Sequence, residues 1–262
     1  MRISNIKLSN FRRFADLEVK NIPASAKLVV LTGPNGSGKS SLFDAMLVRY
    51  RVNSRFGWNG DYQYYNRPDQ SERTVPTDNI AIQTHGAQPL SRGSIYVRSA
   101  YRHDAEFSTK TLSRQGPILD KLPLERLIDI DATVAINYGR LASQAMEDVF
   151  VNEDASTSMG AYRDKIVGDI RAPMQRLFPD LTLVGVGNPL DDGTFYFDKG
   201  SIKNFEYKNL SGGEKASFDL ILDLVVKRKS YGEAIYCIDE PEIHLNTKIQ
   251  GALLKELLDL LP

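Results

Sequence analysis

The segment that most constrains the fold is a glycine-rich run near the N-terminus that fits the pattern GxxxxGK(S/T). It lies between an apolar run, Lys27–Thr32, and a helix expected over Ser40–Tyr50. Its glycines let backbone N–H groups close around phosphate oxygens, and the following helix directs its positive end at them. A chance glycine-rich turn is the alternative, but it does not explain this placement. The residues of the run are Gly33, Pro34, Asn35, Gly36, Ser37, Gly38, Lys39 and Ser40, with Ser41 next.

A second pattern is the apolar run Ala234–Ile238, which ends in Asp239 and Glu240. An apolar strand that ends in Asp-Glu is typical of a Walker B segment, in which the first carboxylate holds Mg²⁺ and the second polarises the attacking water. A strand that ends in a solvated acidic turn is the alternative. With the glycine-rich run, the pattern predicts an ATPase that uses ATP and Mg²⁺. Glu240 and Lys39 are its expected catalytic residues, and Ser40 and Asp239 its expected metal ligands.

Between these two patterns the chain reads Leu210-Ser211-Gly212-Gly213-Glu214. Locally this is a capping box, in which Ser211 caps a helix and Glu214 reaches back to it. The two glycines also leave a helix N-terminus bare, and such an end suits a γ-phosphate.

In these residues the chain resembles the ABC ATPase superfamily, whose signature is LSGGE or LSGGQ. The resemblance implies that the signature of one subunit completes the ATP site of its partner. Gly33–Ser41 of one chain and Ser211–Glu214 of another would then enclose ATP in a homodimer with two-fold symmetry. ATP would hold the pair closed, and hydrolysis would release it.

The opening Asn10-Phe11-Arg12-Arg13-Phe14 resembles that of the RecF, SMC and OLD-type branch of this superfamily. The resemblance implies that Arg12 and Arg13 lie near the nucleotide; a solvated turn is the alternative. The stretch Asp239–Asn246 resembles the "DEPE-HLH" segment of OLD-type ATPases, in which His244 and Asn246 fall where the D-loop crosses the dimer interface. A helix-cap residue is the alternative for His244.

The expected fold is a single α/β P-loop ATPase domain of the ABC type, with a central mixed sheet, an N-terminal antiparallel β-subdomain and a helical insertion. We expect an N-terminal lobe over 1–116, the insertion over 117–180 and a signature and Walker B lobe over 181–262. Lys27–Thr32 is expected to be the buried central strand. Further strands are expected at Ile80–Gln83, Ser94–Tyr101, Leu181–Val186 and Thr194–Phe197, and helices from about Ser211 and over Thr247–Leu261.

Two features of the family are not evident. There is no clear Q-loop glutamine: Arg98, Ser99 or Arg102 stands near its place, and Gln83 is a weaker candidate. The sequence also ends before the position of a switch histidine, which suggests a truncated chain or one piece of a longer protein. The aromatic stretch Arg51–Arg73 is read as a family-specific insertion, with base stacking as the alternative.

Composition restricts the partners. Lys plus Arg and Asp plus Glu both total 33, so the formal net charge is zero and gives no support for a basic nucleic-acid protein. A local patch leaves contact with DNA or another nucleic acid open. No apolar run has the roughly 20 residues needed to cross a bilayer, which argues against a membrane partner. The single cysteine, Cys237, fits a cytoplasmic protein.

These observations favour an ATP-driven dimer switch in DNA repair or anti-phage defence, coupled to a nuclease domain or partner. One alternative is an SMC-like ATPase that holds DNA, although the stretch Pro117–Phe178 is too short for a long coiled coil. The other is the ATPase subunit of a transporter, against which the Asn10–Phe14 opening counts. A pseudo-ATPase remains open if no switch histidine is supplied.

Overall fold

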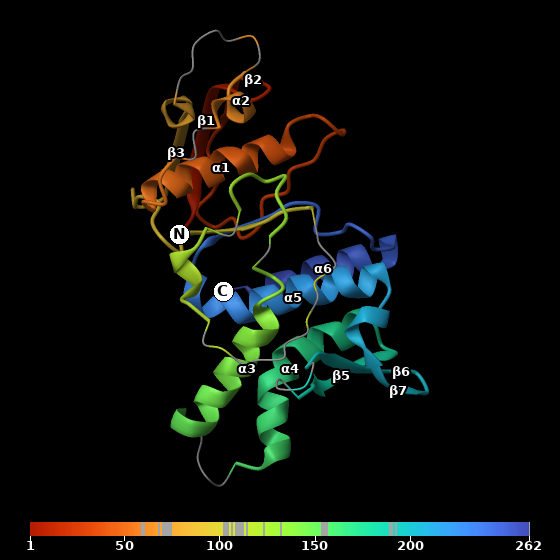
Figure 1. Cartoon of the computed structure of the whole chain (residues 1–262). Coiled ribbons are helices and arrows are strands. Elements are labelled where there is room, and N and C mark those ends of the chain that lie inside the picture. The colour runs from red at the N-terminus through yellow and green to blue at the C-terminus, as the bar shows by residue number, and fades with distance from the viewer. Residues whose placement is uncertain are drawn as a thin grey trace. The chain divides into compact units, whose positions relative to one another are not determined.

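The structure is a computed structural model that describes residues 1–58, 61–67, 69, 75–101, 105, 107, 113, 115–122, 124–131, 133–152, 157–188, 191 and 193–261. It contains two compact units, each assembled from separate stretches of the chain (Figure 1). The first unit comprises Met1–Tyr101, Leu119–Ile130 and Ser230–Asp239. The second comprises Arg102–Ile118, Asp131–Lys229 and Glu240–Pro262.

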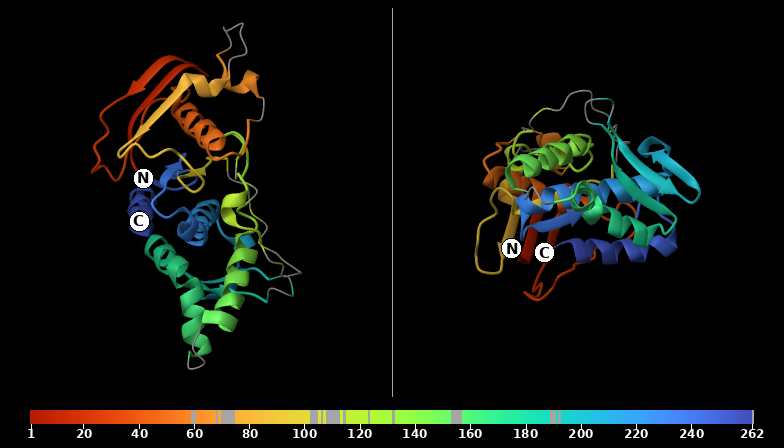
Figure 2. Two further views of the ribbon diagram at one scale, coloured as in Figure 1. Left: turned by 90° about the vertical axis from the view of Figure 1, so that its left-hand side faces the viewer. Right: turned by 90° about the horizontal axis from the view of Figure 1, so that it is seen from below.

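An antiparallel sheet forms the N-terminal part of the first unit, as expected. Its middle strand, β1 (Ile3–Phe11), pairs with β2 (Phe14–Val19) on one side and β3 (Ile80–Thr84) on the other. Ile6 and Leu8 of β1 are buried while Lys7 between them is exposed, the alternation of a strand with one face on a core. Helix α1 (Lys39–Asn53) packs against this sheet (Figure 2).

A parallel pair, β4 (Ile95–Arg98) and β8 (Ile235–Ile238), lies in the same unit. All four residues of β4 are buried, as is usual for parallel strands. The backbone N–H of Asp239 donates to the carbonyl of Arg98 at 2.9 Å and extends the pairing by one residue. The pair thereby places the start of the Walker B loop beside the residue that ends β4.

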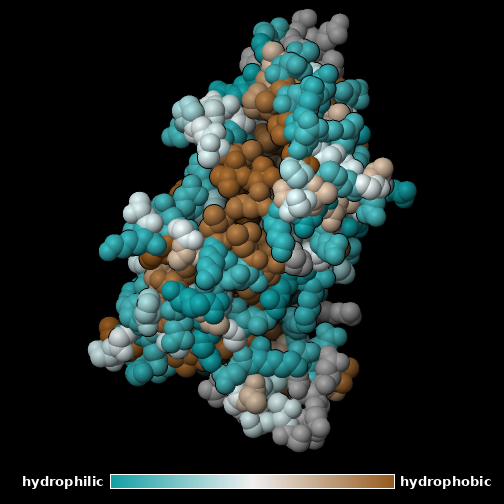
Figure 3. Space-filling view, turned by 180° about the vertical axis from the view of Figure 1, so that it is seen from behind, coloured by the Kyte–Doolittle hydropathy of each residue, from teal (hydrophilic) through white to brown (hydrophobic). Residues whose placement is uncertain are grey.

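The expectation for Lys27–Thr32 was wrong. These residues form no strand, and Leu28, Val29 and Val30 are 44, 53 and 63% exposed. Among the described strands, β8 pairs only with β4, so no ladder reaches the apolar run. A strand needs a neighbour to satisfy its backbone, and apolar composition alone does not provide one. Figure 3 shows apolar side chains gathered on one face of the molecule.

The aromatic stretch after α1 packs several of its described rings against one another. It contains a short helix, α2 (Tyr62–Tyr65), and 3-10 turns follow at Pro76–Asn79 and Ile118–Asp120. Tyr65 is 1% exposed, and Trp58 and Tyr64 contact its ring at centroid distances of 5.3 and 4.7 Å. These rings fill the core of the first unit, which does not favour the base-stacking alternative.

Helices dominate the second unit. The expected insertion contains α3 (Asn137–Glu147), a π turn at Asp148–Asn152 and α4 (Met159–Leu177). The Tyr162 hydroxyl of α4 donates to the carbonyl of Ala145 in α3, so the two helices form a hairpin (Figures 1 and 2). The stretch Leu119–Ile130 was expected in the insertion, but it clusters with the first unit.

The rest of the second unit is a second antiparallel sheet and two helices. The sheet has the order β5 (Leu181–Val186), β6 (Phe195–Lys199) and β7 (Ile202–Glu206), and the sequence reading missed β7. A 3-10 turn, Tyr207–Asn209, leads into α5 (Gly212–Tyr231), and α6 (Thr247–Leu260) comes last. No helix in the described part of the chain is long and apolar enough to span a bilayer.

Candidate nucleotide site

Two side chains that the motifs assign to Mg²⁺ lie in contact. The Ser40 hydroxyl donates to Oδ2 of Asp239 at 2.8 Å, although 199 positions separate the residues in the sequence. Ser40 lies in the first turn of α1, and Asp239 follows β8 directly. A hydroxyl and a carboxylate oxygen side by side are a ligand pair that suits Mg²⁺.

The glycine-rich run needs glycine for steric as well as conformational reasons. Gly38 precedes α1 with φ +105°, and a Cβ there would lie 2.5 Å from Cζ of Phe14 and 2.8 Å from Cδ of Arg13. Gly36 has φ +80°, and a Cβ there would lie 3.3 Å from a guanidinium nitrogen of Arg13. Residues with a Cβ rarely adopt such φ values. The side chain of Arg13 therefore lies across the loop.

Lys39 is held by the loop that it follows. Its ammonium donates to the carbonyl of Gly33 at 2.9 Å and to that of Pro34 at 3.2 Å. The amine thus lies beside the first two residues of the glycine-rich run, where its charge can contact phosphate oxygens.

Arg12 has a different setting from its neighbour. Its guanidinium forms a 2.8 Å ion pair with Oδ2 of Asp44 and lies 3.9 Å from the ring centroid of Tyr64. Asp44 belongs to α1, one turn beyond Ser40, and its side chain is 2% exposed. Arg13 thus contacts the loop, whereas Arg12 forms an ion pair with the helix that follows the loop. Contact of either arginine with a nucleotide remains a prediction.

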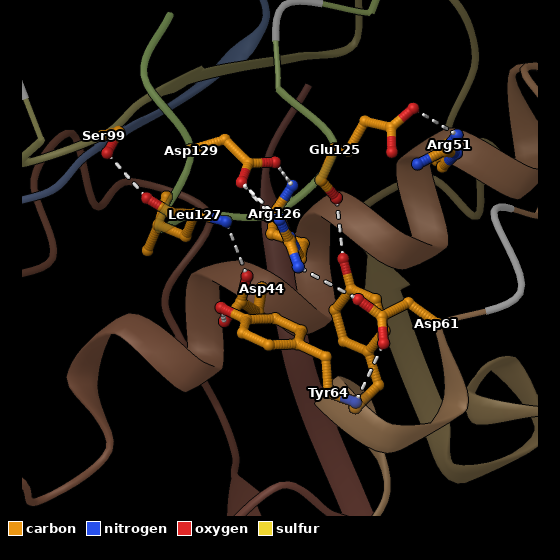
Figure 4. A network of polar contacts seen from close by, with 10 residues as sticks. Asp44, Arg51, Asp61, Tyr64, Ser99, Glu125, Arg126, Leu127 and Asp129 are labelled. Atoms are coloured by element: carbon orange, nitrogen blue, oxygen red, sulfur yellow. Dashed lines mark hydrogen bonds and ion pairs between the residues drawn. The ribbon is translucent and has the colours of Figure 1, made fainter.

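Asp44 organises a wider network, drawn in Figure 4. Its carboxylate also accepts the hydroxyl of Tyr64 at 3.0 Å and the backbone N–H of Leu127 at 2.9 Å. Burial raises the pKa of the Asp44 carboxyl, and the N–H of Leu127, the charge of Arg12 and the Tyr64 hydroxyl act in the opposite direction. The helix after the phosphate loop is thus tied to the stretch Leu119–Ile130.

Of the residues named for the Q-loop position, Ser99 and Gln83 have other partners. The Ser99 hydroxyl donates to the carbonyl of Leu127 at 2.6 Å, so the Leu127 peptide is held from both sides. Arg98 is buried, with 3% exposure. Gln83 lies in β3 and accepts from the Asn5 amide at 2.7 Å. Arg102 lies outside the described residues. A role for any of them at a Q-loop remains a prediction.

The segment after Asp239 contains two residues with left-handed backbone conformations. Glu240 has φ +44° and His244 has φ +66°, and both side chains are exposed. A positive φ is uncommon for residues other than Gly, although Asn, Asp and His adopt it more often than the rest, and it concentrates at functional sites. Asn246 caps α6 by accepting the N–H groups of Lys248 and Ile249 at 3.1 and 3.2 Å, so the cap role weighed for His244 belongs to Asn246.

The signature forms the expected capping box at the start of α5. Oε2 of Glu214 accepts the backbone N–H of Ser211 at 2.8 Å, and the N–H of Glu214 donates to the Ser211 hydroxyl at 3.4 Å. The glycines differ: a Cβ on Gly212 would meet no atom within 4 Å, whereas one on Gly213 would lie 2.9 Å from the carbonyl oxygen of His244. Gly212 is open, and Gly213 packs against the segment after Walker B.

We expect Gly213→Ala to lower the free energy of unfolding by about 1–3 kcal/mol, because the added methyl must displace the backbone at His244. Gly212→Ala is the matched control, since its methyl enters open space and alanine favours the helix. Urea denaturation followed by circular dichroism measures both. Equal stability of the two variants would show that the contact between Gly213 and His244 is not tight in solution.

Three residues were not predicted from the sequence: Asp44 and Tyr64, which contact one another at the helix after the phosphate loop, and Lys199, which contacts Glu214 of the signature. Asp44 carried a signal, because a charged residue four positions after Ser40 shares its helix face and must find a partner if that face is buried. The other two make long-range contacts that no local pattern predicts.

Two family models match the chain. One described as "AAA domain" covers residues 5–48, and one described as "AAA domain, putative AbiEii toxin, Type IV TA system" covers residues 48–262.

Curated relatives include proteins named "Chromosome partition protein Smc". That of Bordetella petrii (strain ATCC BAA-461 / DSM 12804 / CCUG 43448) is 46% identical over 173 residues, which are 64% of this chain and 12% of that protein. That of Xanthomonas oryzae pv. oryzae (strain KACC10331 / KXO85) is 26% identical over 153 residues, 58% of this chain and 11% of that protein. The chain thus spans only about a tenth of the length of these relatives.

A similar solved structure is titled "Crystal structure of the SmcHead bound to the C-winged helix domain of ScpA". The match covers 99% of this chain and 87% of that one, with 13% identity and a TM-score of 0.53, and it concerns the fold alone. The second family model spans most of the chain. The chain therefore belongs to the ATPase family described as "AAA domain, putative AbiEii toxin, Type IV TA system", and its fold is that of a P-loop ATPase head related to the Smc head.

Proposed function

We propose that this chain is an ATPase head that closes into a homodimer around ATP and opens on hydrolysis. The phosphate loop, Gly33–Ser41, holds the phosphates, with Lys39 on the β- and γ-oxygens. Ser40 and Asp239 hold Mg²⁺, and Glu240 polarises the attacking water. The contact between Ser40 and Asp239 is the observation that carries this proposal, because it brings together the side chains from the two motifs that would hold Mg²⁺.

The second copy supplies the signature. Ser211 and Gly212 are exposed, and nothing lies within 4 Å of the Cβ position of Gly212. They stand at the start of a 20-residue helix whose first N–H groups and dipole attract an anion. Because each chain has one loop and one signature, two copies related by a two-fold axis complete two sites. His244, four residues beyond Glu240, is placed by the same proposal at the dimer interface.

The test is the mass of the Glu240→Gln protein in solution, with and without Mg-ATP. The variant keeps the phosphate loop but lacks the general base, so bound ATP persists and the dimer accumulates. We expect a monomer without nucleotide and a dimer with Mg-ATP, measured by light scattering.

Mg-ADP and the double variant Lys39→Ala/Glu240→Gln are the controls, and the protein should stay monomeric in both. A Glu240→Gln protein that binds ATP and stays monomeric would contradict the signature role of Ser211–Glu214. Turnover at the wild-type rate would remove Glu240 from the general-base role.

For the wider role, the Smc relatives favour an ATPase that holds DNA over the repair or anti-phage reading. Repair or defence, with a nuclease domain or partner, is the second candidate, supported by the Asp239–Asn246 segment and by the family description, which names a toxin system. ATP-dependent retention of circular DNA by the Glu240→Gln protein distinguishes them, because only the first candidate requires it. The buried thiol of Cys237 suits a cytoplasmic setting for either.

A further inference from the structure

The signature has an ion-pair partner outside its own motif. Lys199 is the last residue of β6, and its ammonium donates to Oε1 of Glu214 at 2.7 Å. The other oxygen of the same carboxylate, Oε2, accepts the backbone N–H of Ser211. One carboxylate therefore joins the β6–β7 hairpin to the residue that opens the signature.

The pair is protected on the carboxylate side. The side chain of Glu214 is 6% exposed, and that of Lys199 is 30% exposed. Burial alone raises the pKa of the Glu214 carboxyl, but the hydrogen bonds from Lys199 and Ser211 outweigh it, and the pKa lies below its ordinary value. When the cation is removed, a carboxylate buried in this way loses much of the favourable interaction that offsets the cost of its desolvation.

The chain path explains why Lys199 reaches the signature. Lys199 pairs with Ile202 at the end of the hairpin, and Gly200 between them has the left-handed φ of +57° that the tight turn requires. From β7 the chain passes through the turn Tyr207–Asn209 to Leu210, which is 5% exposed and anchors the start of the signature. The hairpin and the signature are thus consecutive parts of one packed unit.

We propose that Lys199 is a positioning residue for the signature, which holds Glu214, and through it Ser211, in the orientation that receives the partner's nucleotide. This inference rests on the proposed ATP-bound dimer. Ser211 is exposed, and its backbone N–H is fixed by Glu214. Without Lys199, the buried carboxylate gains stability by turning toward water, and the capping geometry at Ser211 is lost.

The experiment compares variants in the Glu240→Gln background. Lys199→Met should raise the ATP concentration for half-maximal dimer formation by about tenfold or more, because it truncates one partner of a largely buried charge pair. The affinity of the monomer for a fluorescent ATP analogue is measured at protein concentrations too low for dimers. It should change by less than about twofold, because Lys199 and the phosphate loop then act as independent sites. Lys199→Gln gives the same comparison if the methionine variant does not fold.

Three further variants separate positioning from packing. Lys199→Arg should retain dimer formation, because a guanidinium can still pair with the carboxylate. Lys199→Met/Glu214→Gln should recover much of the loss, because no buried charge remains. Lys203→Met is the matched control: Lys203 lies on β7, pairs with Asp198 and is 69% exposed.

Each remaining outcome is decisive. A dimer that forms normally in Lys199→Met overturns the inference, as does a double variant that is impaired as severely as the single one. A Glu240→Gln parent that stays monomeric with ATP overturns the proposed function, and the role of Lys199 with it. A parent that dimerises while Lys199→Met also dimerises normally leaves the proposed function standing.

Discussion

Lys39→Ala is expected to weaken ATP binding by about 10²- to 10³-fold, the cost of truncating one partner of a desolvated charge pair. The ammonium already lies over the carbonyls of Gly33 and Pro34, so the loop pre-positions the charge that the phosphates need. Without the ammonium, the β- and γ-oxygens keep the backbone N–H groups of the loop as donors but lose their positive counter-charge. Isothermal titration with Mg-ATP measures the loss directly.

Lys27→Ala is the matched control for this prediction. It removes the same charge from an exposed residue shortly before the loop, and it should leave ATP affinity within about twofold. Both variants should unfold at the same temperature as the parent, because neither side chain lies in the core. Tight ATP binding by Lys39→Ala would refute the assignment of the phosphate loop.

The parts of this protein that the sequence predicted well are those with local rules. The helix after the glycine run, the Asp-Glu at the end of β8 and the capping box at Ser211 each depend on residues within a few positions of one another. The N-terminal antiparallel β-subdomain was predicted as well, and a tight turn fixes the register of its strand pair β1–β2.

The misses have non-local causes. Lys27–Thr32 has the composition of a central strand, but the described residues give it no neighbour, and a ladder needs one. The different contacts of the adjacent Arg12 and Arg13 were not predicted either: Asp44 and Tyr64 bind the first while the second crosses the loop, and contact of either with a nucleotide stays a prediction. No pattern within the Asn10–Phe14 opening distinguishes them. The missed strand β7 is mostly exposed, so it carries no apolar alternation.

A buried charge in α5 supports the largest stability effect that we expect. Lys227→Met should lower the free energy of unfolding by about 3–5 kcal/mol, because it removes the cation from a pair of buried carboxylates. The Lys227 ammonium lies 2.7 Å from Oδ1 of Asp223 and 3.5 Å from Oδ2 of Asp131, and all three side chains are at most 4% exposed. Urea denaturation followed by circular dichroism measures the change.

The neighbouring Arg228 is the matched control for Lys227. It pairs with Asp169, but the side chains of Arg228 and Asp169 are 32 and 55% exposed, so Arg228→Met should cost no more than about 1 kcal/mol. Adding Asp223→Asn to Lys227→Met should cost less than the sum of the single changes, because one uncompensated charge disappears and Asn137 can still bond to residue 223. Equal losses in Lys227→Met and Arg228→Met would mean that water reaches the cluster. The cluster would then not fix α5, the helix that begins at the signature and ends just before β8.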